Sequence, residues 1–114
     1  MKAESASAMN DLDQCCEACA ACARTCLNGL YRHCLPAGAE HIDQLHVQLM
    51  SDCIDICKIT ADFLTRGSPR HQRVAAVCAE ICRACAVSCD ALTGMQECAE
   101  ACRQCESSCR LLAR

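Results

Sequence analysis

Sixteen of the 114 residues are cysteine, and most of these cysteines recur at one spacing, C-x3-C-x2-C-x3-C. Thiolates at regular intervals are ligands for soft metal ions, and imidazole and thioether groups extend the same chemistry. Four further residues have this spacing with mixed ligands: His46, Met50, Cys53 and Cys57. The three all-cysteine runs are Cys15, Cys19, Cys22, Cys26; Cys78, Cys82, Cys85, Cys89; and Cys98, Cys102, Cys105, Cys109.

This spacing is helical. Steps of four, three and four residues keep the side chains within a stripe of about 60° on an α-helix. No segment alternates with a period of two, so β-strands are not favoured. Free cysteines often act as small core residues, but packing alone gives no reason to prefer a thiol over Ala or Val at every position. We interpret the four runs as metal-binding stripes along the seam of a helical bundle.

Three breaks rich in Gly and Pro divide the chain into four segments of good helix formers. Gly29 is expected within the last turns of the first helix, Ser68 as the N-cap of the third and Pro69 as its first residue. Short connections make successive helices antiparallel. The sequence therefore predicts an all-α, up-down-up-down four-helix bundle with a cysteine-lined core, in a single domain spanning residues 1–114. The expected helices cover about residues 8–33, 39–66, 70–92 and 95–112.

Antiparallel packing would stack the four stripes into four layers, a hypothesis that rests on spacing and helix order alone. Two cysteines fall outside the layers. Cys16 lies about 100° around the helix from its stripe, and Cys34 lies in an expected turn; each is either an accessory ligand or an incidental thiol. The expected layers, from one end to the other, are Cys26, His46, Cys89, Cys98; Cys22, Met50, Cys85, Cys102; Cys19, Cys53, Cys82, Cys105; and Cys15, Cys57, Cys78, Cys109.

Geometry and charge favour Cu(I) among the ions that thiolates select. Structural zinc and iron–sulfur sites usually draw C-x2-C pairs from loops. Residues four apart on a helix instead lie one turn along the same face, which suits a d10 ion held by two or three sulfurs. A zinc site with four thiolates would bury a net negative charge, whereas Cu(I) with one thiolate is neutral. Coordination arithmetic then gives roughly 8 to 16 ions per chain.

The two ends of the expected bundle differ in chemistry. His33, Cys34 and His41 gather with His46, Met50 and Met95 at one end, where we expect copper to enter and pass inward. Imidazole and thioether groups are weaker, more exchangeable Cu(I) ligands than thiolates. His33 and His41 can equally be solvated loop residues. The other end should be closed by an apolar plug made of Leu12, Phe63, Leu64, Val74, Leu111 and Leu112.

Other function classes find little support in the sequence. The formal net charge of −3 and the pI near 5.7 argue against nucleic-acid partners. No apolar run approaches the ~20 residues that span a membrane, so no membrane partner is expected. The first residues lack a secretory signal, which predicts a cytoplasmic location where thiols stay reduced. We do not expect this protein to be an enzyme. One alternative is an iron–sulfur or dithiol oxidoreductase, because C-x-x-C pairs occur within the stripes. The other alternative is a zinc-buffering thiolate protein.

The three stripes on Ala-rich helices resemble the bacterial copper storage proteins, specifically the cytosolic branch without a signal sequence. The resemblance covers about residues 9–110, and its cysteine spacing is specific. It implies a four-helix bundle that binds many Cu(I) ions in its core, assembles as a homotetramer and is loaded through one end. A copper chaperone or an acceptor protein is a further partner that we expect for such a store. The second stripe departs from the all-cysteine pattern, because only Cys53 and Cys57 in it are thiols.

Overall fold

The structure, a computed structural model, describes the backbone of residues 2–113 and the side chains of residues 11–113. Within this range the chain is almost entirely helical and contains no strand, which confirms the all-α prediction. Short elements connect the first two long helices: the π-helix η1 (Leu30–Cys34), α2 (Leu35–Ala37) and the 3₁₀ helix η2 (Ala39–Ile42). The long helices are α1 (Lys2–Gly29), α3 (Gln44–Thr65), α4 (His71–Asp90) and α5 (Gln96–Ala113).

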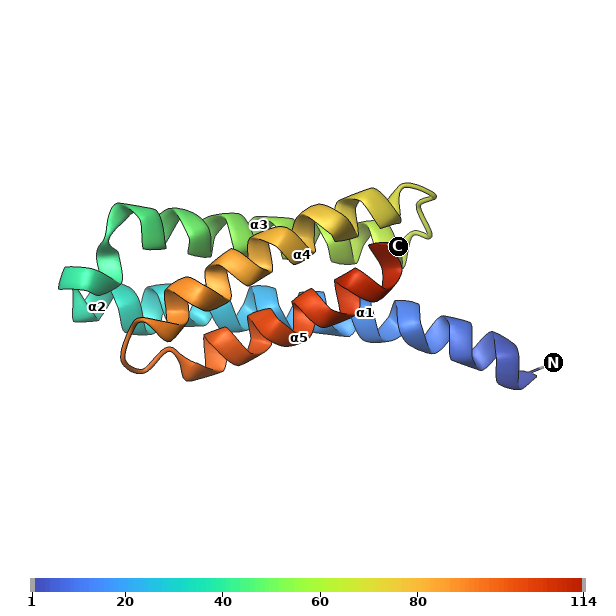
Figure 1. Cartoon of the computed structure of the whole chain (residues 1–114), viewed down its shortest axis with the longest axis horizontal. Helices are drawn as coiled ribbons and strands as arrows, with labels where there is room; N and C mark the ends of the chain where they lie inside the picture. The colour runs from blue at the N-terminus through green and yellow to red at the C-terminus, as the bar shows by residue number, and fades with distance from the viewer. Residues whose placement is uncertain (1, 114) are drawn as a thin grey trace.

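The four long helices form an antiparallel bundle (Figure 1). Each helix packs against its neighbours in the sequence, and α5 returns to pack against α1, which closes the bundle. The connection between α1 and α3 and the turn between α4 and α5 lie at one end, and the turn between α3 and α4 lies at the other (Figure 1). The predicted up-down-up-down four-helix bundle is therefore confirmed.

Cysteine fills the interior of this bundle. Fifteen of the 16 cysteines are buried, and Cys16 is the exception. Small residues flank the stripes and are themselves buried, among them Ala23, Ala79 and Ala99. Small flanking side chains let helix backbones approach closely, so the short cysteine side chains of facing helices reach one another at the bundle axis.

The first helix continues further than the sequence predicts. Instead of stopping at residue 33, the chain stays helical through η1 and α2 to Ala37 and turns at Gly38, which has a φ of +71°. Cys34 follows Cys26 by eight residues, which in an α-helix would place it about 80° off the stripe. The wider π-helix, with about 4.4 residues per turn, removes most of that offset. Cys34 is consequently buried in a helix, and the expected turn at this residue is wrong.

Two other helix starts also differ from expectation. α3 begins at Gln44, five residues late, because the Asp43 side chain accepts a hydrogen bond from the Leu45 N–H and caps the helix there. α4 begins at His71 with Arg70 at the N-cap, so Ser68 and Pro69 do not take their expected positions. The Ser68 hydroxyl instead accepts a hydrogen bond from the Arg70 N–H within the turn.

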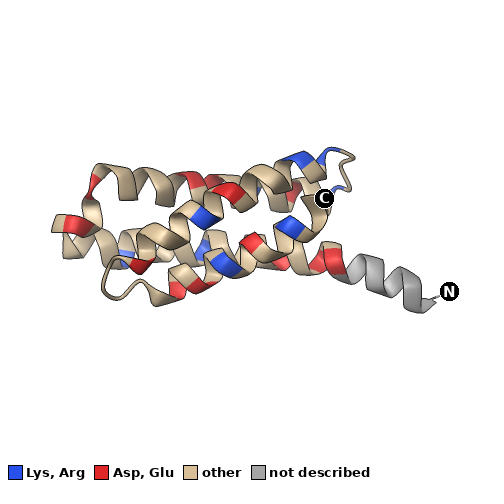
Figure 2. Cartoon of the chain, viewed as in Figure 1, with Lys and Arg blue, Asp and Glu red and all other residues tan. Residues whose placement is uncertain are grey.

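Charged side chains lie on the outer surface of the helices. Figure 2 shows acidic and basic residues interspersed along the bundle. Arg103 on α5 pairs with Asp90 on α4, and Arg110 pairs with Glu106 one turn away at 2.7 Å. Exposed pairs of this kind contribute little to stability. Among the described helices, none is long and apolar enough to cross a membrane.

Candidate metal centre

Eleven of the 16 cysteine sulfurs form one connected network along the bundle axis, through Sγ–Sγ contacts of 3.5–4.0 Å. Three groups of four cysteines have all their Sγ atoms within 4.8 Å of one another. Cys22 and Cys105 each belong to two of these groups, so the groups merge instead of forming separate sites. The groups are Cys19, Cys78, Cys105, Cys109; Cys22, Cys57, Cys82, Cys105; and Cys22, Cys26, Cys53, Cys102.

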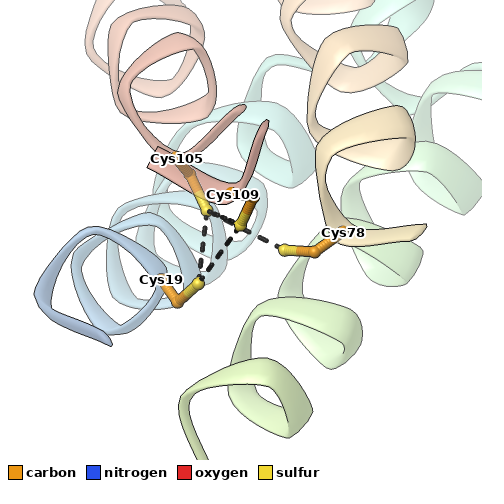
Figure 3. A group of neighbouring side chains, drawn as sticks. All are labelled: Cys19, Cys78, Cys105 and Cys109. Atoms are coloured by element: carbon orange, nitrogen blue, oxygen red, sulfur yellow. Dashed lines mark hydrogen bonds between the residues drawn. The ribbon is translucent and has the colours of Figure 1, made fainter. Parts of the chain in front are cut away.

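Figure 3 shows the first of these groups, in which three helices converge. Cys19 on α1 points toward Cys105 and Cys109 on α5, with Sγ–Sγ distances of 3.5 and 3.8 Å. Cys78 on α4 reaches Cys105 at 3.9 Å. Bonds of about 2.3 Å to sulfur mean that sulfurs at such distances can share one ion after small side-chain movements.

The expected layers hold in register but not as separate units. Contacts within a layer include Cys22–Cys102 at 3.7 Å and Cys57–Cys78 at 3.8 Å. Contacts between adjacent layers are as short: Cys26–Cys102 and Cys57–Cys82 each measure 3.6 Å. Facing helices stagger their side chains, so several sulfurs, such as those of Cys22 and Cys57, touch neighbours both across and along the axis. A continuous column of sulfur replaces the four discrete layers.

The layer expected nearest the His/Met end is not assembled as predicted. His46 contacts no stripe cysteine; its Nε2 lies 3.5 Å from Cys34 Sγ, and its Nδ1 lies 2.8 Å from the Ser88 hydroxyl. Cys98 turns toward the Thr25 carbonyl at 3.6 Å. Cys89 lies 3.6 Å from the Met50 thioether, which also contacts Cys85.

Gly29 explains the position of Cys98. A Cβ atom placed on Gly29 would lie 2.5 Å from Cys98 Sγ, too close for any real contact. The glycine has ordinary helical angles, φ −63° and ψ −42°, so its role is close approach and not backbone freedom. The sequence expectation that Gly29 lies within the helix is correct, but the reason for glycine became visible only when α5 was placed beside α1.

Met50 connects the second stripe to the cysteines of α4. Its Sδ atom lies 3.6 Å from the Sγ atoms of both Cys85 and Cys89 on α4. On the same helix, Cys53 and Cys57 make several contacts each with cysteines of the other helices. The thioether is fully buried and fits the role expected from its register.

Cys16 stays outside the column. Its Sγ lies 3.3 Å from the Thr65 hydroxyl and 3.7 Å from the Ala61 carbonyl, at the surface between α1 and α3. No stripe cysteine is within hydrogen-bonding distance of it among the described side chains. Of its two sequence interpretations, the structure favours an incidental thiol.

The other off-stripe groups gather at the end expected to admit copper. His33 and His41 each donate from Nε2 to the Thr93 carbonyl at 2.9 Å, and their rings are 5.0 Å apart. Both rings are half-buried. They tie η1 and η2 to the turn between α4 and α5, so their observed role is to hold this end of the bundle together.

Two further residues lie at this end: Met95, which was expected here but without an assigned role, and Ser88, which was not expected. Met95 is buried, and its Sδ lies 3.5 Å from Cys34 Sγ. Ser88 holds the His46 ring. Nothing in the spacing marks either residue, because Met95 precedes α5 and Ser88 lies one position before the Cys89 stripe.

The opposite end is closed differently from the expected plug. Leu12 and Leu111 are exposed, by 36% and 54%, and the other four plug residues are only half-buried. In the register that pairs Cys57 with Cys78, the next positions outward are Thr60 and Ala75, and both are fully buried. Thr60 and Ala75 therefore close this end together with Leu64 and Leu112, which pack against the core, whereas Leu12 and Leu111 face solvent.

Electrostatics keep the metal-free core close to neutral. Contacts between thiols shift pKa values in opposite directions: the Cys102 contact lowers the pKa of Cys22, and the same contact raises the pKa of Cys102. Burial raises the pKa of Cys34. The Cys26 thiol and burial together raise the pKa of Cys98 to about 12. Burial disfavours the charged thiolate form of cysteine. The only buried polar or charged side chains described are His46 and Thr60, so no fixed cation in the core counteracts this effect of burial.

Neutral imidazole is also favoured at the His46 position. Burial, with a smaller contribution from nearby His41, lowers the pKa of His46. A neutral ring offers a lone pair at one nitrogen while the other makes a hydrogen bond. At neutral pH, His46 is therefore ready to act as a ligand without losing a proton.

A closed four-helix bundle with a continuous column of reduced sulfur defines a class of thiolate metal-binding bundles, in which the core is the binding site. The chain belongs to the copper storage protein family, which it matches over residues 1–114. A solved structure from Nitrosospira multiformis is 46% identical, with a TM-score of 0.90 and coverage of 91% of this chain and 95% of that one.

Two further solved structures and one sequence relative are similar over most of the chain. The Cu(I)-bound copper storage protein BsCsp3 is 31% identical, with a TM-score of 0.84, over 91% of this chain and 99% of that one. The apo form of copper storage protein 3 from Bacillus subtilis is 34% identical, with a TM-score of 0.79, and the match covers 90% of this chain and 98% of that one. The uncharacterized cysteine-rich protein YhjQ of Bacillus subtilis (strain 168) is 33% identical over 77 residues, 68% of this chain and 70% of that protein.

Proposed function

We propose that this protein stores many Cu(I) ions on the thiolates of its core and is not an enzyme. The observation that carries the proposal is the continuous sulfur column, in which buried Sγ atoms contact one another at 3.5–4.0 Å with no fixed cation beside them. Cu(I) bound by one thiolate is neutral, so a filled column adds no net charge to the interior. Family membership and the Cu(I)-bound relative support the same ion.

The ligands proposed for this store are the 14 stripe cysteines, with Met50 as a thioether ligand at one end of the column. Cys22 and Cys105 are the central members, because each takes part in two groups of four. Cys34 and His46 are proposed as ligands outside the column. Cys16 is not needed, since its contacts are with Thr65 and Ala61.

The test is an anaerobic titration of the reduced protein with Cu(I) against a competing chelator. Roughly 8 to 16 tightly bound, colourless ions per chain are expected. Saturation at one to four ions would instead indicate discrete zinc or iron–sulfur sites, and visible colour in the purified protein would favour the oxidoreductase alternative. Zn(II) titrated in parallel should reach a much lower ratio of metal to sulfur, because tetrahedral zinc uses four ligands.

We further propose that copper enters at the end occupied by His46 and Met95. A depression of about 270 Å³ between the start of α3 and the end of α4 is lined by His46, Ser88, Glu40 and Asp43, among others. Carboxylates at its rim raise the local concentration of cations. A copper chaperone or an acceptor protein would exchange the ion here. Loading that is equally fast in the Glu40→Gln, Asp43→Asn double variant at low ionic strength would argue against this route.

The assembly proposed is a homotetramer in a reducing cytoplasm. Leu27 on α1 and Tyr31 on η1 are 40% and 62% exposed and line a shallow groove with Ile54 on α3. A self-contact through these apolar residues would remove them from water. Sedimentation of the wild type and of a Leu27→Glu, Tyr31→Glu double variant tests this assembly by measuring the molecular mass of each. The wild type should sediment as four chains and the double variant as fewer. Mass spectrometry of protein from cytoplasmic extracts, with thiols trapped, should find the cysteines reduced.

A further inference from the structure

Three soft ligands from three separate elements meet at the end of the bundle, outside the cysteine stripes. Cys34 belongs to η1, His46 to α3, and Met95 immediately precedes α5. Cys34 Sγ lies 3.5 Å from His46 Nε2 and 3.5 Å from Met95 Sδ. The exposed fractions of the three residues are 0%, 3% and 1%. One thiol, one imidazole and one thioether thus converge in a buried position.

These distances fit a three-coordinate d10 ion. With bonds of about 2.3 Å to sulfur and about 2.0 Å to nitrogen, a trigonal ion separates its sulfur and nitrogen ligands by about 3.7 Å and two sulfur ligands by about 4.0 Å. The observed separations are a few tenths of an ångström shorter, so small outward movements of the side chains admit the ion. One thiolate balances the single charge of Cu(I), which leaves a neutral site.

Ser88 prepares the imidazole for this role. Its hydroxyl lies 2.8 Å from His46 Nδ1, which leaves Nε2 facing Cys34. A hydrogen bond at the second nitrogen of a histidine ligand fixes the ring's orientation and tautomer. The side of His46 that meets Ser88 also borders the surface depression lined by Glu40 and Asp43. The three ligands therefore lie between the solvent and the sulfur column.

We infer that Cys34, His46 and Met95 form a discrete site for one Cu(I) ion, with Ser88 as a positioning residue, that is filled and emptied separately from the sulfur column. This inference rests on the proposed storage function and adds a ligand set to it. Among the described side chains, the hydrogen-bonding partners of Cys34 are His46 and Met95 and not a stripe cysteine, which sets this ligand group apart from the column. Met50, 3.6 Å from both Cys85 and Cys89, begins the column on the inner side.

A single-thiolate site should hold copper less tightly than the bridged column, because two of its three ligands are neutral and exchangeable. Its ion is therefore expected to bind last and to leave first. Binding replaces the Cys34 thiol proton: the S–H bond breaks, a Cu–S bond forms and one proton passes to solvent. The copper stays Cu(I) throughout, so no oxidant or reductant takes part.

The first test is nuclear magnetic resonance of the reduced full chain, labelled with ¹³C at the methionine methyl groups and ¹⁵N in the histidine rings. Cu(I) is delivered from a chromogenic chelator in an anaerobic chamber. The Met95 methyl and the His46 Nε2 resonances should shift together, over the last equivalent of copper. Assignments come from Met95→Leu and His46→Gln. If both resonances stay unchanged while the column fills, the inference is overturned and the storage function stands.

The second test counts ions and follows their release to excess chelator. Wild-type protein should show a fast phase of one equivalent, and Cys34→Ser should lose this phase and bind one ion fewer. Cys16→Ser is the matched control, because it removes the other off-stripe thiol and should keep both. Ser88→Ala should weaken this one ion by about 10- to 100-fold, with recovery in Ser88→Thr. A fast phase that survives in Cys34→Ser would refute the inference, whereas a wild-type total of one to four ions would refute the storage function.

Discussion

The number of protons released for each copper bound is a direct measure of how the core holds its cargo. Burial raises the pKa of Cys34, and the Cys26 thiol and burial raise the pKa of Cys98, whereas contacts with other thiols lower the pKa values of Cys15, Cys22, Cys53 and Cys78. Because no fixed cation lies in the core to balance thiolates, we expect most of the buried thiols to start neutral. Each sulfur that binds copper must therefore give up its proton. If every stripe thiolate bridges two ions, 14 sulfurs bind 14 ions and the ratio is about one proton per copper. If each ion has two thiolates of its own, seven ions release the same 14 protons and the ratio is about two.

Electrostatics decide between these arrangements. An ion with two private thiolates carries a net charge of −1. Two such sites one helical turn apart, about 5.4 Å, would repel each other by about 3 kcal/mol at an effective dielectric constant near 20. Seven sites along one axis would accumulate this cost at every step, whereas bridged Cu(I) thiolate is neutral. We therefore expect a ratio close to one.

The assay adds Cu(I) anaerobically to reduced protein at pH 7 in a weakly buffered solution, with the acid released measured by back-titration. The chelator alone serves as the blank. The same ratio sets the pH dependence: one proton displaced per ion raises the apparent affinity about tenfold per pH unit, as long as the pH stays below the raised thiol pKa values. A ratio near two would refute the bridged column, and a ratio near zero would show that the thiols were already ionised.

Four further outcomes follow from the packing and charge of the core. Gly29→Ala should lower the free energy of unfolding in urea, because overpacking against Cys98 costs about 1–3 kcal/mol, whereas the gain in helix propensity is about 1 kcal/mol. In a Cys98→Ala background the same Gly29→Ala substitution should be neutral or stabilising. Equal effects of Gly29→Ala in the wild-type and Cys98→Ala backgrounds would contradict the clash with Cys98. Cys105→Ser should reduce copper capacity by about one or two ions, while Cys16→Ser leaves it unchanged. The metal-free protein should keep its helical circular dichroism, since thiols already pack the core, and bound copper should raise its Tm; a random-coil spectrum would instead indicate metal-driven folding. Because burial and neighbouring thiols raise the pKa of Cys89 and Cys98 from 9.0 to about 12, the metal-free protein should be stable below pH 9 and lose stability as the pH rises from 9 toward 12, as thermal unfolding at each pH would reveal.

The fold and the sulfur column could be predicted from the sequence because both depend on periodicity. A spacing of four, three and four residues places Cys15 through Cys26 on one helix face, whatever the helix packs against. Gly and Pro mark the breaks, and short breaks force antiparallel neighbours. Burial of the stripes follows, because four helices that each carry one face of soft ligands enclose these faces when they form a bundle.

Features that depend on local backbone chemistry were predicted less well. Ser68 and Pro69 fit a common helix start, but the chain forms an extra turn and α4 begins at His71. The π-helix that carries Cys34 inward has no signal in the sequence, since its residues are ordinary helix formers. Asp43 is a suitable N-cap, yet the preceding Ala39–Ile42 segment is also helix-compatible, so the true start of α3 was not evident.

The sequence by itself determined which residues could bind metal and on which helix face each lies, because side-chain direction within a helix follows from the residue's position in it. Only the tertiary structure decided which of them meet. His46 lies 12 residues after Cys34 in the chain, and Met95 lies 61 residues after Cys34. No periodicity connects these three residues. Their convergence depends on how η1, α3 and the turn before α5 close one end of the bundle, which is a property of packing between helices and not of any helix alone.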